Sequence, residues 1–163
     1  MTPEQARTFA LLAHGDQRYG DRPYSYHLDA VVAHLAGFGD DAKIIGYLHD
    51  VVEDTDTTHA DIQLAFGDFI ARCVAIVTDE AGNNRKQRKA RSYAKMAGVT
   101  GEESVALVVK VADRLANIQS CVADDNRRLL AMYQNEHEVF TRSVYRPGLC
   151  EALWEQLHRL IQS

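Results

Sequence analysis

A histidine and three carboxylates lie within six residues of one another near the middle of the first half of the chain. His49 and Glu53 are four residues apart, and so are Asp50 and Asp54, which in a helix places each pair one turn apart on adjoining faces. Residues 40–52 have the apolar spacing of an amphipathic helix, so these polar groups lie beside a buried surface. Carboxylates this close repel one another unless a cation lies among them. A divalent metal site is one interpretation, and a solvated acidic helix end is the other.

Two further residues of metal-binding type come from other predicted helices. His27 lies in the first turn of the second predicted helix, and Asp113 lies in the most apolar one. Together with His49 and Asp50 they form a four-ligand set of imidazoles and carboxylates without thiolate. Such a set suits Mn²⁺, Fe²⁺ or Zn²⁺ better than Ca²⁺.

The residues around this set indicate hydrolysis of a phosphate compound. Glu53 and Asp54 are placed to handle the proton of a water that a cation activates, since metal binding can lower the pKa of water from about 15.7 toward 7. Arg18, Lys110 and part of a basic run over residues 85–95, which holds six basic residues and no acidic one, suit an anionic substrate. A solvated helix face is the alternative for that run. These residues predict metal-assisted hydrolysis of a phosphoester or pyrophosphate, without naming the substrate.

A polar stripe crosses the most apolar predicted helix. Lys110, Asp113, Asn117 and Ser120 recur at i, i+3, i+7 and i+10, which is one continuous face. Buried polar groups without partners cost roughly 1–3 kcal/mol each, so this stripe needs partners unless it is a surface face. We therefore expect it to line the site.

The elements that position these residues are all predicted to be helices. Apolar periodicity predicts an all-α chain of about eight to nine helices. Thr2 and Thr100 each begin a capping-box pattern, and a tyrosine-rich loop is expected over residues 16–25. The predicted helices cover residues 3–14, 25–38, 40–52, 58–66, 68–77, 85–95, 100–120, 125–144 and 148–162.

Bulk composition limits the class of protein. The 163 residues predict a single domain over residues 1–163, with its core motifs in residues 14–120. A net charge of −5 argues against a dedicated nucleic-acid binder. Three widely spaced cysteines predict reduced thiols in a cytoplasmic protein. Neither an apolar signal segment nor a membrane-spanning run is apparent.

Three segments resemble a known family. They are AHGDQRYGDRPYSYH (residues 13–27), YLHDVVEDT (residues 47–55) and VVKVADRLANIQS (residues 108–120). The order of histidine, His-Asp and a late aspartate is similar to the HD-domain metal-dependent phosphohydrolases. The segments resemble most closely the hydrolase domain of the RelA/SpoT group in its small stand-alone form, the small alarmone hydrolases (Mesh1-like). The resemblance extends over about residues 6–145, and it implies that the chain carries the hydrolase domain without a synthetase half.

The resemblance implies roles for particular residues. The family removes pyrophosphate from the 3′ position of ppGpp and pppGpp, normally with Mn²⁺. Its metal ligands match His27, His49, Asp50 and Asp113. Its water-activating acidic pair matches Glu53 and Asp54. Its nucleotide contacts match Arg18, which packs on the purine base, together with Asn117 and Ser120.

Two departures from the family pattern leave the substrate open. Tyr19 stands where a second basic residue is common, and Leu129 stands where a basic residue is expected one turn before Tyr133. These positions concern recognition of the base and the 5′-phosphates. Hydrolysis of (p)ppApp or of the 2′-phosphate of NADPH therefore stays open, as does a catalytically silent module that binds a nucleotide. The partner expected is a small nucleotide, and a homodimer is compatible with the sequence.

Overall fold

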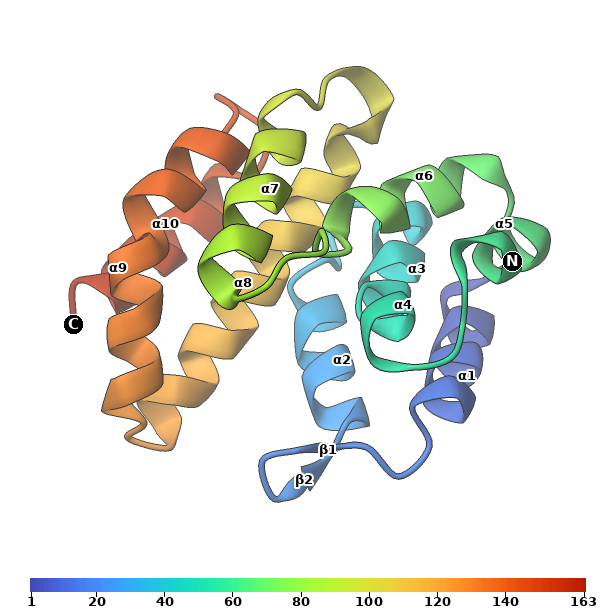
Figure 1. Cartoon of the computed structure of the whole chain (residues 1–163), viewed down its shortest axis with the longest axis horizontal. Coiled ribbons are helices and arrows are strands. Elements are labelled where there is room, and N and C mark those ends of the chain that lie inside the picture. The colour runs from blue at the N-terminus through green and yellow to red at the C-terminus, as the bar shows by residue number, and fades with distance from the viewer.

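The protein is almost entirely helical, as the periodicity predicts. The computed structural model describes residues 1–163 and contains ten α-helices, one short 3₁₀ helix and one small hairpin (Figure 1). The helices are α1 (Pro3–His14), α2 (Ser25–Ala33), α3 (Asp40–Leu48), α4 (Val51–Asp54), α5 (His59–Phe66), α6 (Asp68–Val77), α7 (Arg85–Ala97), α8 (Val105–Ala123), α9 (Arg127–Val144) and α10 (Glu151–Ile161). The 3₁₀ helix η1 covers Gly101–Ser104.

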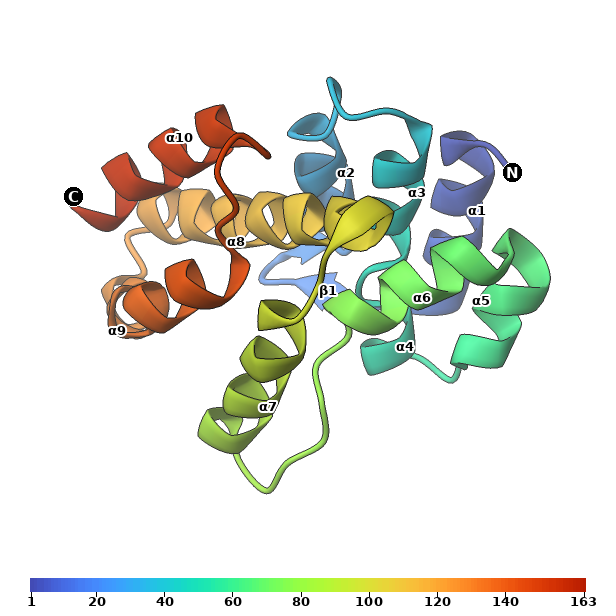
Figure 2. The ribbon, with the colours of Figure 1, turned by 90° about the horizontal axis from the view of Figure 1, so that it is seen from above.

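Helix α8 forms the centre of the molecule. It contacts α2, α3 and α6 on one side and α9 and α10 on the other, and it crosses the middle of the view from above (Figure 2). Thirteen of its 19 residues are buried, because its sequence is apolar on nearly every face. One continuous hydrophobic cluster of 38 buried residues surrounds it. Polar residues on α8 therefore lie inside the protein, where they need partners.

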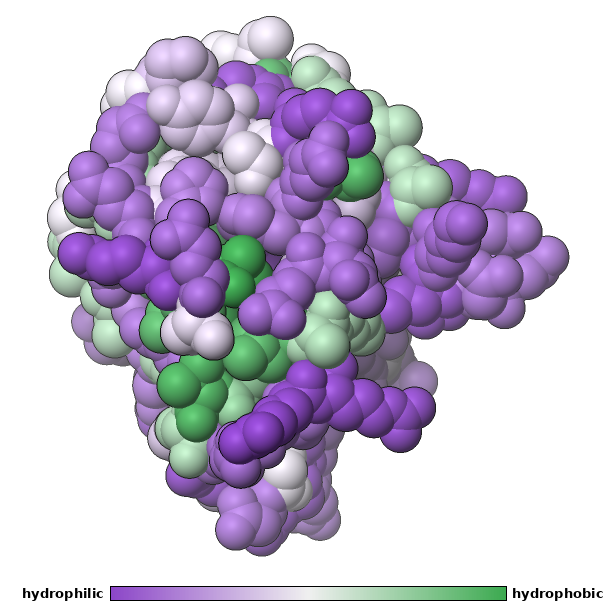
Figure 3. All heavy atoms as spheres, turned by 90° about the vertical axis from the view of Figure 1, so that its left-hand side faces the viewer, coloured by the Kyte–Doolittle hydropathy of each residue, from purple (hydrophilic) through white to green (hydrophobic).

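Polar side chains and helix caps lie on the outside of the molecule. Thr2 begins α1 with the predicted capping box, which it shares with Gln5. Hydrophilic residues cover most of the face that carries α9 and α10, with one patch of hydrophobic residues showing between them (Figure 3).

The three cysteines are buried free thiols, as predicted. None of the helices combines the length and the apolar character that crossing a bilayer requires.

Three local predictions are wrong. The helix predicted over residues 40–52 is interrupted, because Asp50 adopts φ −105° and ψ −3° and a new turn begins at Val51. The helix predicted over residues 25–38 ends at Ala33, after which the backbone makes i→i+3 bonds such as Leu35 N–H to the carbonyl of Val32. The second capping box does not form, since Gly101 has a positive φ of 69° and starts a 3₁₀ turn.

The tyrosine-rich loop folds into a hairpin. Strand β1 (Arg18–Tyr19) pairs antiparallel with β2 (Arg22–Pro23), and the turn between them uses Gly20 at φ 62°. The hairpin brings the ring of Tyr19 parallel to that of His27, with the ring centroids 4.7 Å apart. A segment with no regular periodicity thus covers one side of the predicted metal ligands.

Candidate metal centre and its cavity

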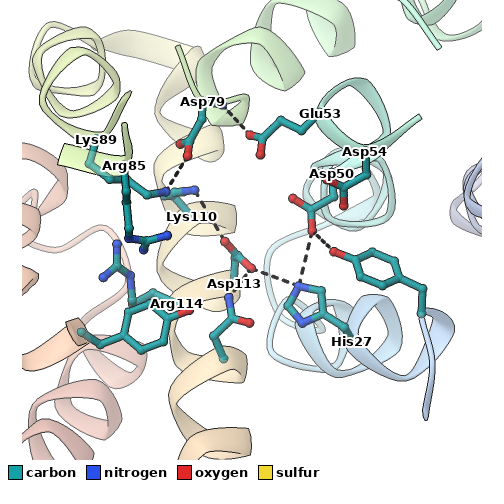
Figure 4. Close-up of a pocket in the computed structure, with 13 residues that line it drawn as sticks. His27, Asp50, Glu53, Asp54, Asp79, Arg85, Lys89, Lys110, Asp113 and Arg114 are labelled. Carbon is teal, nitrogen blue, oxygen red and sulfur yellow. Dashed lines mark hydrogen bonds and ion pairs between the residues drawn. The ribbon is translucent and has the colours of Figure 1, made fainter. Parts of the chain in front are cut away.

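Four predicted metal ligands converge on one point. His27 Nε2 lies 3.3 Å from His49 Nε2 and 3.1 Å from Asp113 Oδ1. His49 Nε2 lies 3.0 Å from Asp50 Oδ2 and 3.3 Å from Asp113 Oδ1, and Asp50 Oδ2 is 3.7 Å from His27 Nε2. Donors bound at about 2.0–2.2 Å to one metal ion lie roughly 3.0–3.6 Å apart, so the separations among His27, His49 and Asp50 are close to those around a shared ion, and Asp113 Oδ1 lies beside both histidines. Figure 4 shows the convergence of α2, the α3–α4 junction and α8.

The break between α3 and α4 explains how two adjacent residues reach the same point. His49 follows the last residue of α3, and Asp50 is the N-cap of α4. In an uninterrupted helix, consecutive side chains diverge by about 100°. At Asp50 the backbone angles of φ −105° and ψ −3° depart from those of a regular helix, and the two side chains meet with His49 Nε2 3.0 Å from Asp50 Oδ2.

Neighbouring groups orient each ligand. The carbonyl of Gly46 accepts a hydrogen bond from His49 Nδ1 at 2.6 Å, which leaves Nε2 free to bind a metal. The hydroxyl of Tyr24 donates to Asp50 Oδ2 at 2.5 Å, and the amide of Asn117 donates to Asp113 Oδ1 at 3.0 Å. Such outer contacts are typical of metal sites, because they fix the tautomer and the orientation of the ligands.

The electrostatics of the four ligands also favour a bound cation. Burial opposes ionisation of Asp50 and Asp113, but the adjacent His49 lowers the pKa of both carboxyls below their ordinary values. Two ionised carboxylates therefore lie against two buried imidazoles. The donor set of two nitrogens and two oxygens, without thiolate, fits a divalent transition metal.

A cavity of about 230 Å³ opens from this cluster. Acidic groups line one side of it and basic groups the other (Figure 4). Its lining consists of Tyr24, His27, Asp50, Glu53, Asp54, Asp79, Arg85, Lys89, Lys110, Asp113, Arg114, Asn117 and Tyr133.

The acidic side holds the predicted catalytic pair. Glu53 Oε1 accepts the backbone N–H of Asp79 at 2.5 Å, and Asp54 Oδ2 accepts from Gln17 Nε2 at 2.9 Å. Burial of its carboxyl raises the pKa of Glu53 above the ordinary value. A carboxyl with a raised pKa is a stronger proton acceptor once it is ionised, which suits a role in activating water.

The basic side consists of two residues of the predicted basic run and two residues of α8. Lys89 Nζ lies 2.7 Å from Asp79 Oδ2, and burial lowers its pKa below the ordinary value. Lys110 is 7% exposed; burial opposes its charge, but nearby carboxylates, led by Asp113, raise its pKa. Arg85 and Arg114 complete this side.

The remainder of the basic run does not line the cavity. Lys95 donates to the carbonyls of Ala75 and Thr78 at the end of α6, and Arg91 donates to the carbonyl of Ala81. These contacts attach α7 to the body of the protein, which Figure 2 shows as a helix standing out from it. Of the residues in the basic run, only Arg85 and Lys89, one helical turn apart, line the cavity.

A second cavity of about 350 Å³ adjoins the first and shares Asn117 and Tyr133 with it. Ser120 lines this cavity, together with Tyr19 and Leu129. Arg18 lines neither cavity: its guanidinium donates to the carbonyl of Asp21 at 2.6 Å, within its own hairpin. The role predicted for Arg18 in packing on a base stays a prediction.

Sequence reasoning missed several residues that line the site or contact the catalytic pair. Tyr24 and Tyr19 lie in the tyrosine-rich segment, which the sequence predicts only as a loop, and Arg114 lies next to the predicted ligand Asp113. No sequence pattern identifies Asp79 and Gln17, because each contacts the catalytic pair from a distant part of the chain. Asp79 lies 26 positions from Glu53, and Gln17 lies 37 positions from Asp54.

Comparison with known proteins places this arrangement in a family. The HD domain pattern matches residues 6–148. The guanosine-3′,5′-bis(diphosphate) 3′-pyrophosphohydrolase of Aquifex aeolicus is 31% identical over 149 residues, covering 90% of this chain and 21% of that protein. The zebrafish (Danio rerio) enzyme of the same name, MESH1, is 36% identical over 118 residues, covering 68% of this chain and 64% of that protein. The chain therefore spans about a fifth of the length of the bacterial relative.

A solved structure confirms the fold. A metazoan orthologue of SpoT that hydrolyses ppGpp superposes with a TM-score of 0.83, covering 98% of this chain and 93% of that one at 24% identity. At this identity the likeness is one of fold alone. The helical fold, the paired histidines and aspartates, and the pattern match over most of the chain agree, and the chain belongs to the HD domain family.

Proposed function

We propose that this protein is a metal-dependent pyrophosphohydrolase that removes the 3′-pyrophosphate of (p)ppGpp. One observation carries the proposal: three of the four candidate metal ligands, a carboxylate pair and a cluster of cations line a single cavity, and the fourth candidate ligand, His49, lies 3.0 Å from Asp50. The names of the Aquifex and zebrafish relatives support the choice of substrate. Because the chain spans only part of its bacterial relatives, the proposal concerns this domain.

His27, His49, Asp50 and Asp113 would hold one divalent ion, and we propose Mn²⁺. Bound there, the ion supplies Lewis acidity that makes a water nucleophile available near neutral pH. Glu53 and Asp54 line the same cavity, and one of these two carboxylates would accept the proton that the attacking water releases. The hydrogen bonds from the Asp79 backbone and from Gln17 hold the pair in place.

The cations bind the phosphate groups. Lys89 and Lys110 lie beside the acidic pair, where a phosphate chain attached to the reacting centre needs its charge balanced. Arg85 and Arg114 extend the positive side of the cavity toward Tyr133. The adjoining cavity, with Tyr19, Asn117 and Ser120, is placed to receive the nucleoside. We propose in addition a cytoplasmic location, and a homodimer stays a prediction.

A panel of ppGpp, ppApp and NADPH tests this proposal. We expect Mn²⁺-dependent release of pyrophosphate from ppGpp, read out by product chromatography, with loss of activity in chelator. Glu53→Gln and Asp54→Asn should retain the metal while kcat falls about 10²–10⁴-fold, and Glu138→Gln on the exposed face of α9 should match the wild-type protein. Preferred release of phosphate from NADPH, or no turnover of any nucleotide with metal bound, would overturn the proposed function.

A further inference from the structure

His14 is a buried histidine that the proposed function does not use. It lies in the last turn of α1 and is 6% exposed. Its Nδ1 lies 2.7 Å from Gln17 Oε1, whereas its Nε2 is buried without a hydrogen-bond partner. An unsatisfied buried nitrogen lowers stability, so an apolar side chain would serve packing better at this position. This points to a role for Nδ1.

The donors and acceptors in the two hydrogen bonds that link His14, Gln17 and Asp54 can be assigned in only one way. Asp54, once ionised, can only accept, so the amide nitrogen of Gln17 must face it, at 2.9 Å. The amide oxygen of Gln17 then faces His14, and Nδ1 of His14 must carry the proton that it donates. A chain of two hydrogen bonds thus runs from His14 through Gln17 and ends on a carboxylate of the proposed catalytic pair.

Asp54 needs such support from outside its own helix. It is the last residue of the four-residue helix α4, which offers its side chain few neighbours. The backbone of Gln17 is held separately, by its N–H to the carbonyl of His14 and by its own carbonyl, which accepts from Tyr24. These backbone bonds anchor the start of the hairpin, and the side-chain amide is left free to contact Asp54.

We propose that His14 and Gln17 are positioning residues for the proposed hydrolysis. They engage Oδ2 of Asp54 and so fix its carboxylate, with Oδ1 left to accept a proton in the cavity. The inference rests on the proposed function, which it extends to two residues outside the cavity lining. The same histidine also supports the metal side, since its ring packs on Tyr24 with centroids 4.5 Å apart and Tyr24 donates to Asp50.

Four single variants and the Gln17→Met/His14→Leu double variant, each made in the 163-residue, Mn²⁺-loaded protein, test the inference. Gln17→Met removes the amide at nearly constant size, and His14→Leu removes the Nδ1 donor. His14→Asn keeps an N–H near the position of Nδ1. Gln134→Met is the matched control, because Gln134 donates to the carbonyl of Ile161 and lines neither of the two cavities. For each we measure kcat, KM, bound metal and Tm.

We expect Gln17→Met and His14→Leu each to lower kcat about three- to tenfold, the effect of losing one hydrogen bond, with KM and bound metal unchanged. The double variant should lose no more than the larger single loss, since both changes break one chain of contacts. His14→Asn should retain most of kcat, and His14→Leu should keep or raise Tm. Gln134→Met should behave as wild type.

Two results would overturn the inference while leaving the proposed function in place. One is a wild-type kcat in His14→Leu. The other is an equal loss of kcat and Tm in His14→Leu and His14→Asn, which would make His14 a packing residue. A wild-type protein that binds Mn²⁺ but hydrolyses no nucleotide would instead overturn the proposed function, and this inference with it.

Discussion

Glu136 on α9 accepts hydrogen bonds from two of the arginines that line the cavity, and replacing it tests how much these contacts contribute to stability. Its carboxylate accepts two hydrogen bonds from Arg85, at 2.8 and 3.3 Å, and one from Arg114 at 2.9 Å. The hydroxyl of Tyr93 also donates to it, at 3.3 Å. Arg114 is only 4% exposed, so Glu136 is the anion that balances a buried charge.

Glu136→Gln keeps the shape of the side chain and one acceptor oxygen but removes the charge. Breaking a buried ion pair by removing one partner costs about 3–5 kcal/mol. Because the Glu136 side chain is 18% exposed and the amide oxygen still accepts, we expect a loss of about 2–4 kcal/mol in the free energy of unfolding. The matched control is Glu138→Gln, because Glu138 forms an exposed pair with Arg142 that should contribute about 0–1 kcal/mol.

Urea unfolding at pH 7 measures both variants against wild type. A pH series adds a second test: burial opposes ionisation of Glu136, but its arginine partners lower its pKa below the ordinary 4.5. The stability gained from a lowered pKa is present above about pH 4.5 and is lost as the pH falls through the folded-state pKa. The gap between wild type and Glu136→Gln should therefore shrink in acid. Equal stability of the Glu136→Gln and Glu138→Gln variants at pH 7 would refute this reasoning.

Three other outcomes are expected. Gly46→Ala should lower the free energy of unfolding by about 1–3 kcal/mol and weaken metal binding, because a Cβ there would lie 2.7 Å from Leu35 Cδ1. Calorimetry measures this loss against the control variant Gly37→Ala, in which the added Cβ meets open space. Burial opposes the charge of His49, but its flanking carboxylates raise its pKa well above 6.5. Unfolding of the chelator-treated protein should therefore show stability falling as the pH rises above about 6.5, while titration shows Mn²⁺ affinity rising. Arg18→Ala should raise KM for the preferred nucleotide about tenfold at constant metal content; an unchanged KM would leave Arg18 as a hairpin residue.

The sequence was sufficient to predict the cluster of candidate metal ligands, because its signals are local. Residue type and spacing identify His49 and Asp50 directly, and the first turn of a predicted helix identifies His27. Helix boundaries were predicted well where a cap defines them, as at Thr2 and Thr58, whose side chains both form capping boxes. Periodicity cannot show a break inside an apolar run, which is why the interruption at Asp50 was not foreseen.

The contacts that complete the site could not be predicted, because they depend on how distant elements pack. The Tyr19 hydroxyl donates to Asn117 across 98 positions of the sequence, and the backbone N–H of Asp79 meets Glu53 from another element. Neither contact involves a pattern within one element. Arg18 is the opposite case, in which a local pattern does not predict the contact. Its spacing from His27 matches a motif, but its guanidinium donates a hydrogen bond within its own hairpin.

The polar stripe of α8 is a local sequence pattern whose residues also line the cavities that distant elements complete. Its predicted order along the helix is the order in which its members line the two cavities: Lys110 and Asp113 line the metal cavity, Asn117 lines both, and Ser120 lines the second. A helix rises 1.5 Å per residue, so the ten steps from Lys110 to Ser120 extend over about 15 Å. That span suits a nucleotide lying along α8 with its reacting phosphate at the metal end. Within this geometry, substitutions at Ser120 should change the preference between bases, whereas substitutions at Lys110 should weaken every substrate that carries the same phosphate chain.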